Sequence, residues 1–274
     1  MKKLLALLLA VLILLSLTAC GAKEDKVIKV GVLQSDGIKA IDSEKHRAHE
    51  REERKIALDA TVERVNYNNL SAALMDLESG KITMFFAEES TANYIASRND
   101  KIAVVKDSAT TNFSMMTMDS SKDVFDILNN AILEMKADGT LDALIENELK
   151  AYIESDPEAK DLPKFEGGKT IKVGITGDVP PMDFVASNGK AAGFNIALLT
   201  EIANRAQVNI ELVQIESGAR PMALSSGKVD AVFWTKSFTC NICGNDVSEK
   251  IEGTLVTESY FTDSPAKIVL KSDK

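Results

Sequence analysis

An internal repeat constrains the fold of this chain more than any other feature of its sequence. The segment VIKVGV at residues 27–32 matches TIKVGI at residues 170–175, and LESGKI at residues 77–82 matches LSSGKV at residues 224–229. The two matches are separated by nearly the same number of residues, so together they are stronger evidence than either alone. A chain of this kind is expected to fold as two similar units.

Strand and helix patterns alternate within each repeat. Each Ser-Gly-Lys turn leads into an apolar run, ITMFF at residues 82–86 and VDAVFW at residues 229–234, as expected of strands buried on both faces of a parallel sheet. An apolar stripe predicts an amphipathic helix over residues 194–206, followed by a strand over residues 208–213. Residues 70–77 predict a shorter helix in the first repeat. This alternation favours two similar α/β lobes.

Two further helices and a linker separate the repeats. Residues 124–135 carry a helical apolar stripe that ends near Gly139, and residues 141–153 predict a second helix. Residues 155–168 contain two Pro and two Gly without helical periodicity. We interpret this last segment as a linker.

The N-terminus has the pattern of an export signal. Two Lys precede an apolar run over residues 4–15, which is shorter than the roughly 20 residues that span a bilayer as a helix. The sequence LTACG that follows resembles the lipobox of bacterial lipoproteins. The resemblance implies that residues 1–19 are a signal peptide, that Cys20 is lipidated, and that residues 20–26 form a polar tether. The alternative is an ordinary signal peptide in which Cys20 is incidental.

Composition excludes several classes of protein. The chain has 274 residues, of which 45% are hydrophobic and 27% are charged, as in ordinary globular proteins. Its net charge of −9 disfavours nucleic acid as a partner. We find no Gly-rich phosphate loop, Ser-His-Asp set or pair of catalytic carboxylates, and we therefore predict no cofactor and no catalytic residue.

The cysteines and histidines do not predict a metal site. Cys240 and Cys243 form a CxxC pair, which outside the cytoplasm is most simply a local disulfide. A metal site would need further ligands, and the only histidines, His46 and His49, lie in the other repeat on a charged stretch. A redox role is a less favoured alternative for the CxxC pair.

Beyond the repeat, long segments resemble the type II solute-binding proteins that serve amino-acid ABC transporters. Residues 169–274 resemble the first lobe of that family through IKVGITGDVPPMDF, NGKAAGFNIALL, ALSSGKVDAVF and TESYF. Residues 28–153 resemble its second lobe and C-terminal helices through IKVGVLQSDG, LESGKITMFFAEESTANYI and NNAILEMKADGTLDALIENEL. The resemblance implies an α/β class, two-lobed periplasmic-binding-protein type II fold.

The order of the lobes is reversed relative to the family. The predicted organisation is a lobe 2-like unit at residues 27–118, helices packing on lobe 1 at 119–154, the linker at 155–168 and a lobe 1-like unit at 169–274. We interpret this order as a circular permutation, with one covalent crossing between the lobes near residues 110–118. The alternative is a remnant of a fused tandem protein whose half-domains do not close on each other.

Ligands in open α/β sheets bind beyond the carboxyl ends of the strands. The resemblance places the acid that holds a ligand ammonium at Glu88, with Glu89 as a register alternative. It places a frequent acidic or aromatic contact at Asp178. Trp234 ends a strand at the expected cleft, where it could cover a ligand or pack in the hinge.

The resemblance also implies polar contacts from both lobes. Ligand-binding hydroxyl and backbone positions of the first lobe fall on Thr235 and Ser237. A turn that receives a carboxylate in the second lobe falls on Ser35, Asp36 and Gly37. For each position the alternative is a solvated loop side chain or a turn former.

One departure from the family puts an ordinary α-amino acid ligand in doubt. The family usually has an Arg a few residues past the Thr235 to Ser237 region, where it clamps the ligand carboxylate, but residues 239–243 read TCNIC. Lys236 offers a point charge instead of a planar fork. Arg220 precedes a helix and either reaches the cleft or is solvated.

The sequence therefore favours a monomeric solute-binding protein held by its lipid at the extracytoplasmic face of the cell membrane. It would bind an amino acid or related small polar solute and deliver it to an ABC permease. The alternatives are a dehydratase-type enzyme with an acid in the same cleft, and a non-transporting sensor or inactive remnant.

Overall fold

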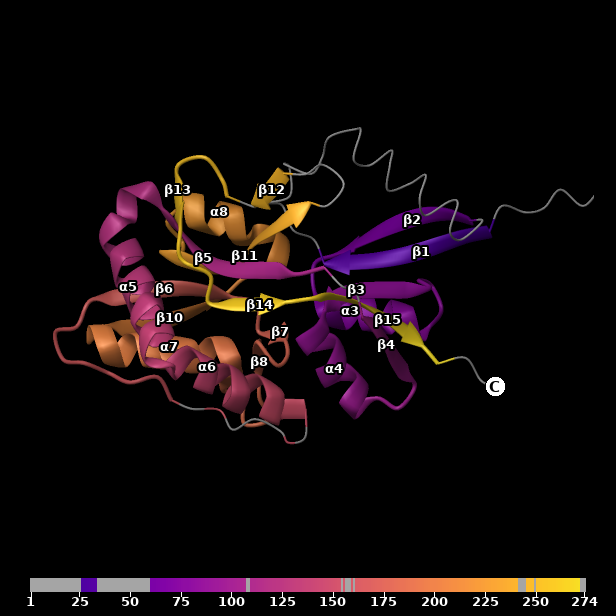
Figure 1. The fold of residues 1–274 in the computed structure, drawn as a ribbon, viewed down its shortest axis with the longest axis horizontal. Helices are drawn as coiled ribbons and strands as arrows, with labels where there is room; N and C mark the ends of the chain where they lie inside the picture. Colours follow the sequence, from indigo (N-terminus) through magenta and orange to yellow (C-terminus); the bar gives the residue numbers. More distant parts are fainter. Residues whose placement is uncertain are drawn as a thin grey trace, which may run out of the picture.

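The computed structural model of this chain describes residues 26–33, 60–106, 109–153, 155, 159, 161–240, 245–248 and 250–271. Several predictions lie outside these residues: the signal peptide, Cys20, the turn from Ser35 to Gly37, the two histidines and Cys243. No helix in the described part of the chain is long and apolar enough to cross a membrane. The described residues form two α/β lobes that lie side by side (Figure 1).

The small lobe is built on a five-stranded sheet. Its strand order is β2-β1-β3-β15-β4, with β1 parallel to β2 and β3, and β15 antiparallel to both β3 and β4. The elements of this lobe are β1 (Lys26–Leu33), β2 (Ala60–Tyr67), α3 (Leu70–Glu78), β3 (Met84–Glu88), α4 (Glu89–Arg98), β4 (Ile102–Lys106) and β15 (Pro265–Leu270).

The large lobe is built on a sheet of order β10-β6-β11-β5-β13, to which β12 and β14 add by pairing with β11 and β5. Its sheet consists of β5 (Thr111–Met118), β6 (Thr170–Ile175), β10 (Asn209–Gln214), β11 (Ala231–Cys240), β12 (Asn245–Ser248), β13 (Thr254–Val256) and β14 (Phe261–Asp263). Its helices are α5 (Lys122–Asp138), α6 (Thr140–Ile145), α7 (Phe194–Ala206) and α8 (Arg220–Ser225), and a small sheet of β7 (Asp178–Val179), β8 (Asp183–Val185) and β9 (Ala191–Ala192) lies beside them.

The two sheets have the same strand order. In each, the first strand of the unit lies between the second and the third, and both neighbours run parallel to it. The repeated sequences of residues 27–32 and 170–175 fall on the corresponding strands β1 and β6. The predicted two-lobed α/β fold class is therefore confirmed, and the sequence repeat is a repeat of structure.

The connection between the lobes differs from the prediction. One crossing was expected, but the chain crosses twice, between β4 and β5 and again between β14 and β15. β5, expected in the first unit, lies in the large sheet, and β15, expected in the second unit, lies in the small sheet. Each sheet thus contains one antiparallel strand from the other half of the chain. The boundaries at residues 118 and 274 do not match the lobes, because strand pairing and not sequence continuity defines a lobe.

The helices that follow β5 belong to the large lobe. α5 and α6 pack against α7, and buried apolar residues of α5 and α7 share one core with the sheet. α5 ends at Gly139, which has a left-handed φ of 80° as expected at a helix C-terminus. The second predicted helix is α6, which continues as a π-helical segment over Glu146–Lys150 and a 3-10 turn over Ala151–Ile153.

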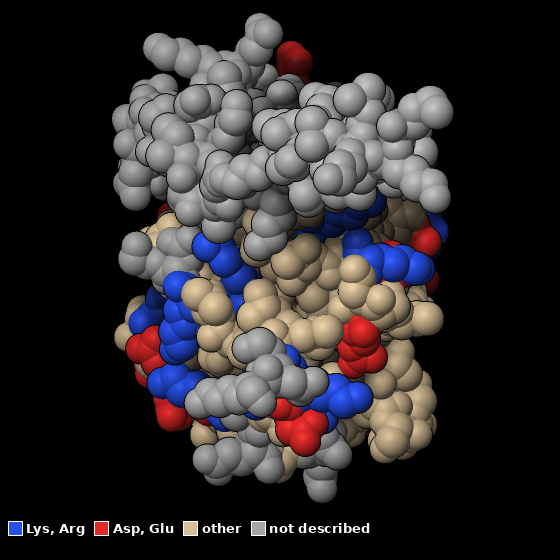
Figure 2. All heavy atoms as spheres, turned by 90° about the vertical axis from the view of Figure 1, so that its right-hand side faces the viewer, with Lys and Arg blue, Asp and Glu red and all other residues tan. Residues whose placement is uncertain are grey.

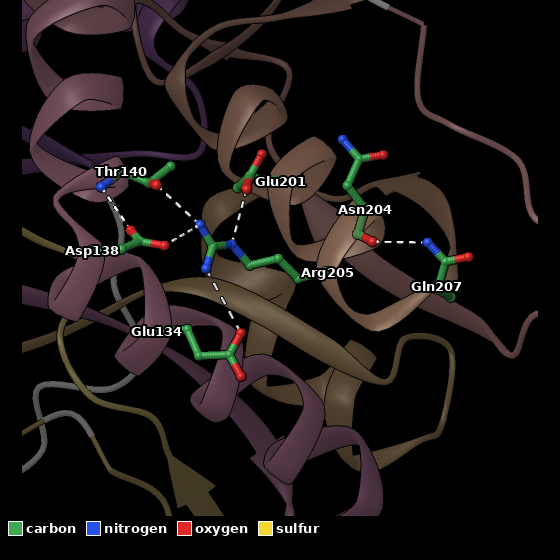
Figure 3. Close-up of polar contacts among 7 residues, drawn as sticks. All are labelled: Glu134, Asp138, Thr140, Glu201, Asn204, Arg205 and Gln207. Carbon is green, nitrogen blue, oxygen red and sulfur yellow. Dashed lines mark hydrogen bonds and ion pairs between the residues drawn. The ribbon is translucent and has the colours of Figure 1, made fainter.

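A charged network joins α7 to the junction of α5 and α6 (Figure 3). The guanidinium of Arg205 on α7 contacts the carboxylates of Asp138 at 2.7 Å and Glu201 at 2.9 Å, and it donates to the Thr140 hydroxyl. Hydrogen bonds from Thr140 together with the Arg205 guanidinium lower the pKa of Asp138 to about 2. This network thus connects three helices of the large lobe, α5, α6 and α7.

The start of α7 depends on a glycine. Gly193 precedes the helix with φ 110° and ψ 176°, a conformation that L side chains rarely adopt. A Cβ at this position would lie 2.5 Å from the carbonyl oxygen of Met182 and 2.6 Å from that of Pro181. Only glycine allows this close approach of the two backbone segments.

We expect Gly193→Ala to lower the free energy of unfolding by about 3 kcal/mol or more, because it adds a backbone clash to an unfavourable φ. Gly189→Ala is the matched control, since Gly189 has φ 78° but open space around it, and should cost about 1–2 kcal/mol. Urea denaturation followed by the fluorescence of Trp234, the single Trp, measures both. Equal losses in the two variants would contradict this account of the helix start.

Candidate functional site

A cavity of about 230 Å³ lies between the two lobes. Its walls include the carboxyl ends of β1 and β3 in the small lobe and of β11 in the large lobe, together with Thr176, which follows β6. This is the position at which ligands bind in open α/β sheets. Its polar and charged lining includes Arg64, Glu88, Thr91, Ser217, Arg220 and Lys236.

An ion pair crosses this cavity. The Lys236 ammonium on β11 lies 2.6 Å from the Glu88 Oε1 atom at the end of β3, so the pair joins the large lobe to the small lobe. The other carboxylate oxygen of Glu88, Oε2, is buried and accepts no hydrogen bond within the described part of the chain. Glu89, the register alternative, does not line the cavity and pairs instead with Lys106. Of the two acids, only Glu88 is among the described residues that line the cavity.

A buried carboxylate organises the large-lobe wall of the cavity. Asp183 is fully buried, and its Oδ1 accepts hydrogen bonds from the Thr176 N–H, the Thr176 hydroxyl and the Gly177 N–H at 2.6–2.9 Å. Its Oδ2 accepts from the Asn195 amide at 2.7 Å and from the Trp234 indole at 3.2 Å. One side chain thus ties together the turn after β6, the first turn of α7 and the cavity-lining Trp.

Trp234 lies at a β-bulge in β11. Val232 pairs with Met116 and Thr235 pairs with Ser114, so that two residues of β11 oppose one residue of β5. Trp234 has φ 68°, which is rare for a bulky side chain. Its ring packs edge-on against Phe113 at 4.9 Å between centroids. Trp234 therefore lines the cavity and also packs beside β5.

The bulge shifts the alternation of side chains along β11. Trp234, Lys236 and Phe238 line the cavity between the lobes, whereas Thr235 and Ser237 do not. Thr235 and Ser237 line a second, polar pocket of about 270 Å³ on the large lobe. The structure thus places the two predicted hydroxyl contacts away from the cavity, because an extra residue in a strand moves each later side chain to the opposite face.

Asp178 makes a contact between the lobes outside the cavity lining. Its Oδ2 accepts a hydrogen bond of 2.9 Å from the backbone N–H of Leu70, the first residue of α3. A carboxylate is stabilised at a helix N-terminus by the free N–H groups and the helix dipole. Burial nevertheless raises the pKa of Asp178 above its usual value. The residue holds the lobes together and does not line the cavity.

Two more contacts join the lobes beside α4. The ring of Tyr94 on α4 lies 6.1 Å from the ring of Phe184 on β8. The guanidinium of Arg98 at the end of α4 donates to the backbone carbonyl of Tyr152, at 2.9 Å, and lies over the Tyr94 ring at 3.7 Å. Together with the Asp178 contact, these interactions show the lobes closed around the cavity.

The second crossing between the lobes is anchored by Asp263. Its Oδ2 accepts hydrogen bonds from the backbone N–H and the hydroxyl of Ser90 in the first turn of α4, at 3.1 and 2.5 Å. Burial, with a contribution from the nearby Glu88 carboxylate, raises the pKa of Asp263 above its usual value. The crossing is thereby attached to the same helix that follows Glu88.

Two arginines line the cavity from opposite lobes. Arg220, at the start of α8, is half-buried, and it donates from Nε to the Ser217 carbonyl and from Nη1 to the Phe233 carbonyl at 2.9 and 2.8 Å. Arg64 lies on β2 and is exposed. The structure therefore answers the question left open for Arg220, because the side chain reaches the cavity.

Sequence reasoning did not single out Asp183, Arg64 or Thr91. Asp183 lies within the quoted PPMDF segment, where an acid between two apolar residues at the start of a short strand is a sign of a buried polar contact. Arg64 and Thr91 carry no such sign, because only the strand order brings β2 and the first turn of α4 to the cavity.

Charge on the outer end of the small lobe is mixed. Lys and Arg lie there among Asp, Glu and uncharged residues, and the described atoms on this face form no broad basic surface (Figure 2).

Comparison with known proteins points to one family for part of the chain. The sequence profile of bacterial extracellular solute-binding proteins, family 3, matches residues 171–241, about a quarter of the chain. The L-arginine-binding protein of Pseudomonas aeruginosa is 26% identical over 110 residues, which is 40% of this chain and 39% of that relative. Residues 171–241 thus resemble bacterial extracellular solute-binding proteins of family 3.

Solved structures are less similar. The ligand-binding component of an ABC-type import system from Staphylococcus aureus, with zinc bound, aligns with TM-score 0.46 and 12% identity over 90% of this chain and 66% of that one. The GluR0 ligand-binding core in complex with L-glutamate aligns with TM-score 0.45 and 10% identity over 91% of this chain and 87% of that one. Because these TM-scores lie below 0.5, the fold assignment rests on the strand order described above.

We expect Asp183→Asn to lower the free energy of unfolding by about 3 kcal/mol or more, because an amide group would face buried donors that now share a carboxylate. The emission of Trp234 should also change as its indole loses this acceptor. Asp161→Asn is the control, since the Asp161 carboxylate is 80% exposed in its pair with Lys190 and should contribute about 1 kcal/mol or less. A loss of unfolding free energy in Asp183→Asn no greater than in Asp161→Asn would show that the hydrogen bonds of Asp183 contribute little to stability.

Proposed function

We propose that this protein binds an amino acid or a related small polar solute between its lobes and delivers it to an ABC permease. The observation that carries the proposal is the cavity between the lobes, which has charged side chains of both signs and walls from both halves of the chain. At about 230 Å³ it is smaller than the roughly 300–1,000 Å³ of pockets for drug-sized ligands. It therefore suits a solute of amino-acid size.

Capture would be coupled to closure. A ligand that contacts both lobes favours the state in which they are together. The ion pair of Lys236 with Glu88 and the hydrogen bond from Leu70 to Asp178 form only in that state, since each joins the two lobes. The crossings at β4–β5 and β14–β15 would act as the hinge. The contacts of the solute with both lobes would add to these two interlobe contacts in stabilising the closed state.

Specific residues are proposed to contact the solute. Glu88 offers a buried acceptor, Oε2, for an ammonium or hydroxyl group, and Trp234 offers an apolar face. Arg220 offers a guanidinium that takes the place of the arginine missing after Ser237. The turn from Ser35 to Gly37 stays a prediction for a carboxylate contact. Asp178, Thr235 and Ser237 are not proposed to contact the solute, because none of them is among the described residues that line this cavity.

We also propose that the lobe order is a circular permutation of the family order. The family profile matches only in the second half of the chain, beginning at residue 171, where β6 begins the large-lobe unit. In the small sheet, β15 is antiparallel to β3 and β3 is parallel to β1, so β15 finishes at the edge where β1 starts. Across the sheet these two points are two strand spacings apart, about 10 Å, and the register offsets them by about three residues, roughly 10 Å, along the strands. A short connection could join them, as permutation between related proteins requires.

Ligand-free protein should gain thermal stability with at least one member of a panel of amino acids and related solutes. A ligand at one hundred times its Kd adds about 2.7 kcal/mol, which for a domain of this size raises Tm by roughly 5–10 °C. Chromatography of the recovered ligand should show it unchanged, whereas conversion to a product would favour the dehydratase-type alternative. No shift with any member, on protein stripped of ligand by unfolding and refolding, would contradict the proposal.

Glu88→Gln should weaken binding of that ligand by about three- to tenfold, because it removes an ion pair that exists only between closed lobes. Glu89→Gln is the matched control, since the neighbouring Glu89 pairs with Lys106 outside the cavity. Isothermal titration calorimetry measures both variants. Equal affinities for the two would show that the cavity-facing acid has no part in closure.

Lipid anchoring at Cys20 predicts that the full chain, produced in a bacterium, partitions into the detergent phase and gains mass from acyl chains. Cys20→Ser should move the protein to the aqueous phase and remove that mass. Mass spectrometry of the N-terminal peptide checks both points. A wild-type peptide without acyl groups would instead favour an ordinary signal peptide.

The permutation can be tested by restoring the family order. A chain that starts at Lys169, is joined from Lys271 to Lys26 by a flexible linker, and ends at Ile153 should fold and bind the same ligand within about threefold. Calorimetry and circular dichroism compare it with the natural order. An unfolded product would favour the tandem remnant.

A further inference from the structure

The charge of the cavity points to the class of solute. Among its described lining residues, Arg64, Arg220 and Lys236 are cationic and Glu88 is the one anionic side chain. The Lys236 ammonium and the Glu88 carboxylate are already paired at 2.6 Å, so their charges cancel. The two guanidinium groups are left, and neither contacts a carboxylate within the described part of the chain. The charged side chains among the described lining residues therefore carry a net positive charge.

The guanidinium of Arg220 is held in place by the protein. Its Nε and Nη1 atoms donate to the backbone carbonyls of Ser217 and Phe233, which fixes the plane of the group. The remaining Nη2 has no hydrogen-bond partner among the described residues. A planar group oriented in this way, with donors still available, is suited to a carboxylate.

The two guanidinium groups come from different lobes. Arg64 lies on β2 of the small sheet and Arg220 at the start of α8 in the large lobe, and both line the same cavity. A solute with a single anionic group can engage one of them fully. A solute with an anionic group at each end can engage both, and it then favours the closed state because it contacts both lobes.

The rest of the lining fits a short solute with an uncharged body. The hydroxyl of Thr91, a residue only 2% exposed, lines the cavity and has no partner among the described residues. A buried polar atom of this kind is costly unless a ligand or water satisfies it. Apolar surface comes from Val32, Leu33, Phe86, Val179, Trp234 and Phe238.

We propose that the solute is a small dicarboxylate, with one carboxylate at Arg220 and the other at Arg64. An α-amino group on it is compatible, because Glu88 Oε2 is a buried acceptor in the same cavity. A cationic amino acid is disfavoured, since its side chain would meet two guanidinium groups of like charge. The dicarboxylate proposed for this cavity thus differs from L-arginine, which the name of the Pseudomonas relative gives as the ligand of that protein. This inference rests on the proposed solute-binding function.

The test compares solutes that differ in charge at nearly constant size. Ligand-stripped full chain is titrated with succinate, 2-oxoglutarate, L-glutamate, L-glutamine and L-arginine, with binding followed by calorimetry and by Trp234 fluorescence. We expect at least one dicarboxylate to bind, and L-glutamate to bind at least tenfold more tightly than L-glutamine. L-Glutamine replaces only the second carboxylate, so this ratio isolates the second anionic contact.

Variants assign the two contacts. Arg220→Gln and Arg64→Gln should each weaken binding of the best dicarboxylate by at least tenfold. The variant that lacks the arginine facing the second carboxylate should have a smaller effect on binding of L-glutamine, which has no second carboxylate. Because Arg220 also supports two backbone carbonyls, Arg220→Lys serves as a second variant that keeps the charge and loses the fork, and circular dichroism checks folding. Lys228→Gln, on an exposed turn before β11, removes a positive charge outside the cavity and should change affinity less than twofold.

The outcomes separate this inference from the proposed function. Tightest binding of L-arginine, or equal binding of L-glutamate and L-glutamine, overturns the dicarboxylate assignment and leaves solute binding supported. Binding of dicarboxylates that is unaffected by Arg64→Gln also overturns it, because the second contact is then absent. If no solute in this panel or in the wider amino-acid panel binds, the assignment and the proposed function both fail.

Discussion

The hydrogen bonds of Asp183 fix the wall on which the rest of the site depends. This carboxylate is buried in the large lobe and holds the turn after β6, the first turn of α7 and the indole of Trp234 in one arrangement. Charge-assisted hydrogen bonds in a low-dielectric interior are strong, and losing the Asp183 carboxylate would leave several donors without acceptors. Trp234 is in turn the residue at which β11 bulges. The position of Lys236, and with it the ion pair to the small lobe, therefore follows from the same buried charge.

The exchanged strands explain how the two repeats form one structural unit. Each sheet contains an antiparallel strand supplied by the other half of the chain, β15 in the small lobe and β5 in the large lobe. Neither sheet is complete without the other half of the chain, and two short crossings join the lobes. Asp263 lies at one crossing and is bonded to the start of α4. This attachment links the crossing to the helix that directly follows the cavity residue Glu88.

Local patterns in the sequence were sufficient to predict the main helices and strands, but they were insufficient to predict which side chains line the cavity. The stripe over residues 194–206 predicted α7 with its observed bounds, and the repeat placed β1 and β6 correctly. Glu88, Trp234 and the cavity at the strand ends also followed from sequence and resemblance. The bulge was not visible, because a single φ of 68° at Trp234 depends on tertiary packing, and it moved Thr235 and Ser237 to another face. The exchanged strands were misplaced, and the interlobe contact of Asp178 was missed, for the same reason, since contacts between distant segments leave no local pattern.

A crystal structure of the protein with its solute bound tests the central claim most directly. The account predicts electron density for one small molecule inside the cavity between the lobes, in contact with Arg64 or Glu88 from the small lobe and with Arg220 or Trp234 from the large lobe. It also predicts that the pair of Lys236 and Glu88 is retained in the closed state. Density that contacts a single lobe, or that lies in the polar pocket beside Thr235 and Ser237, would contradict capture between the lobes.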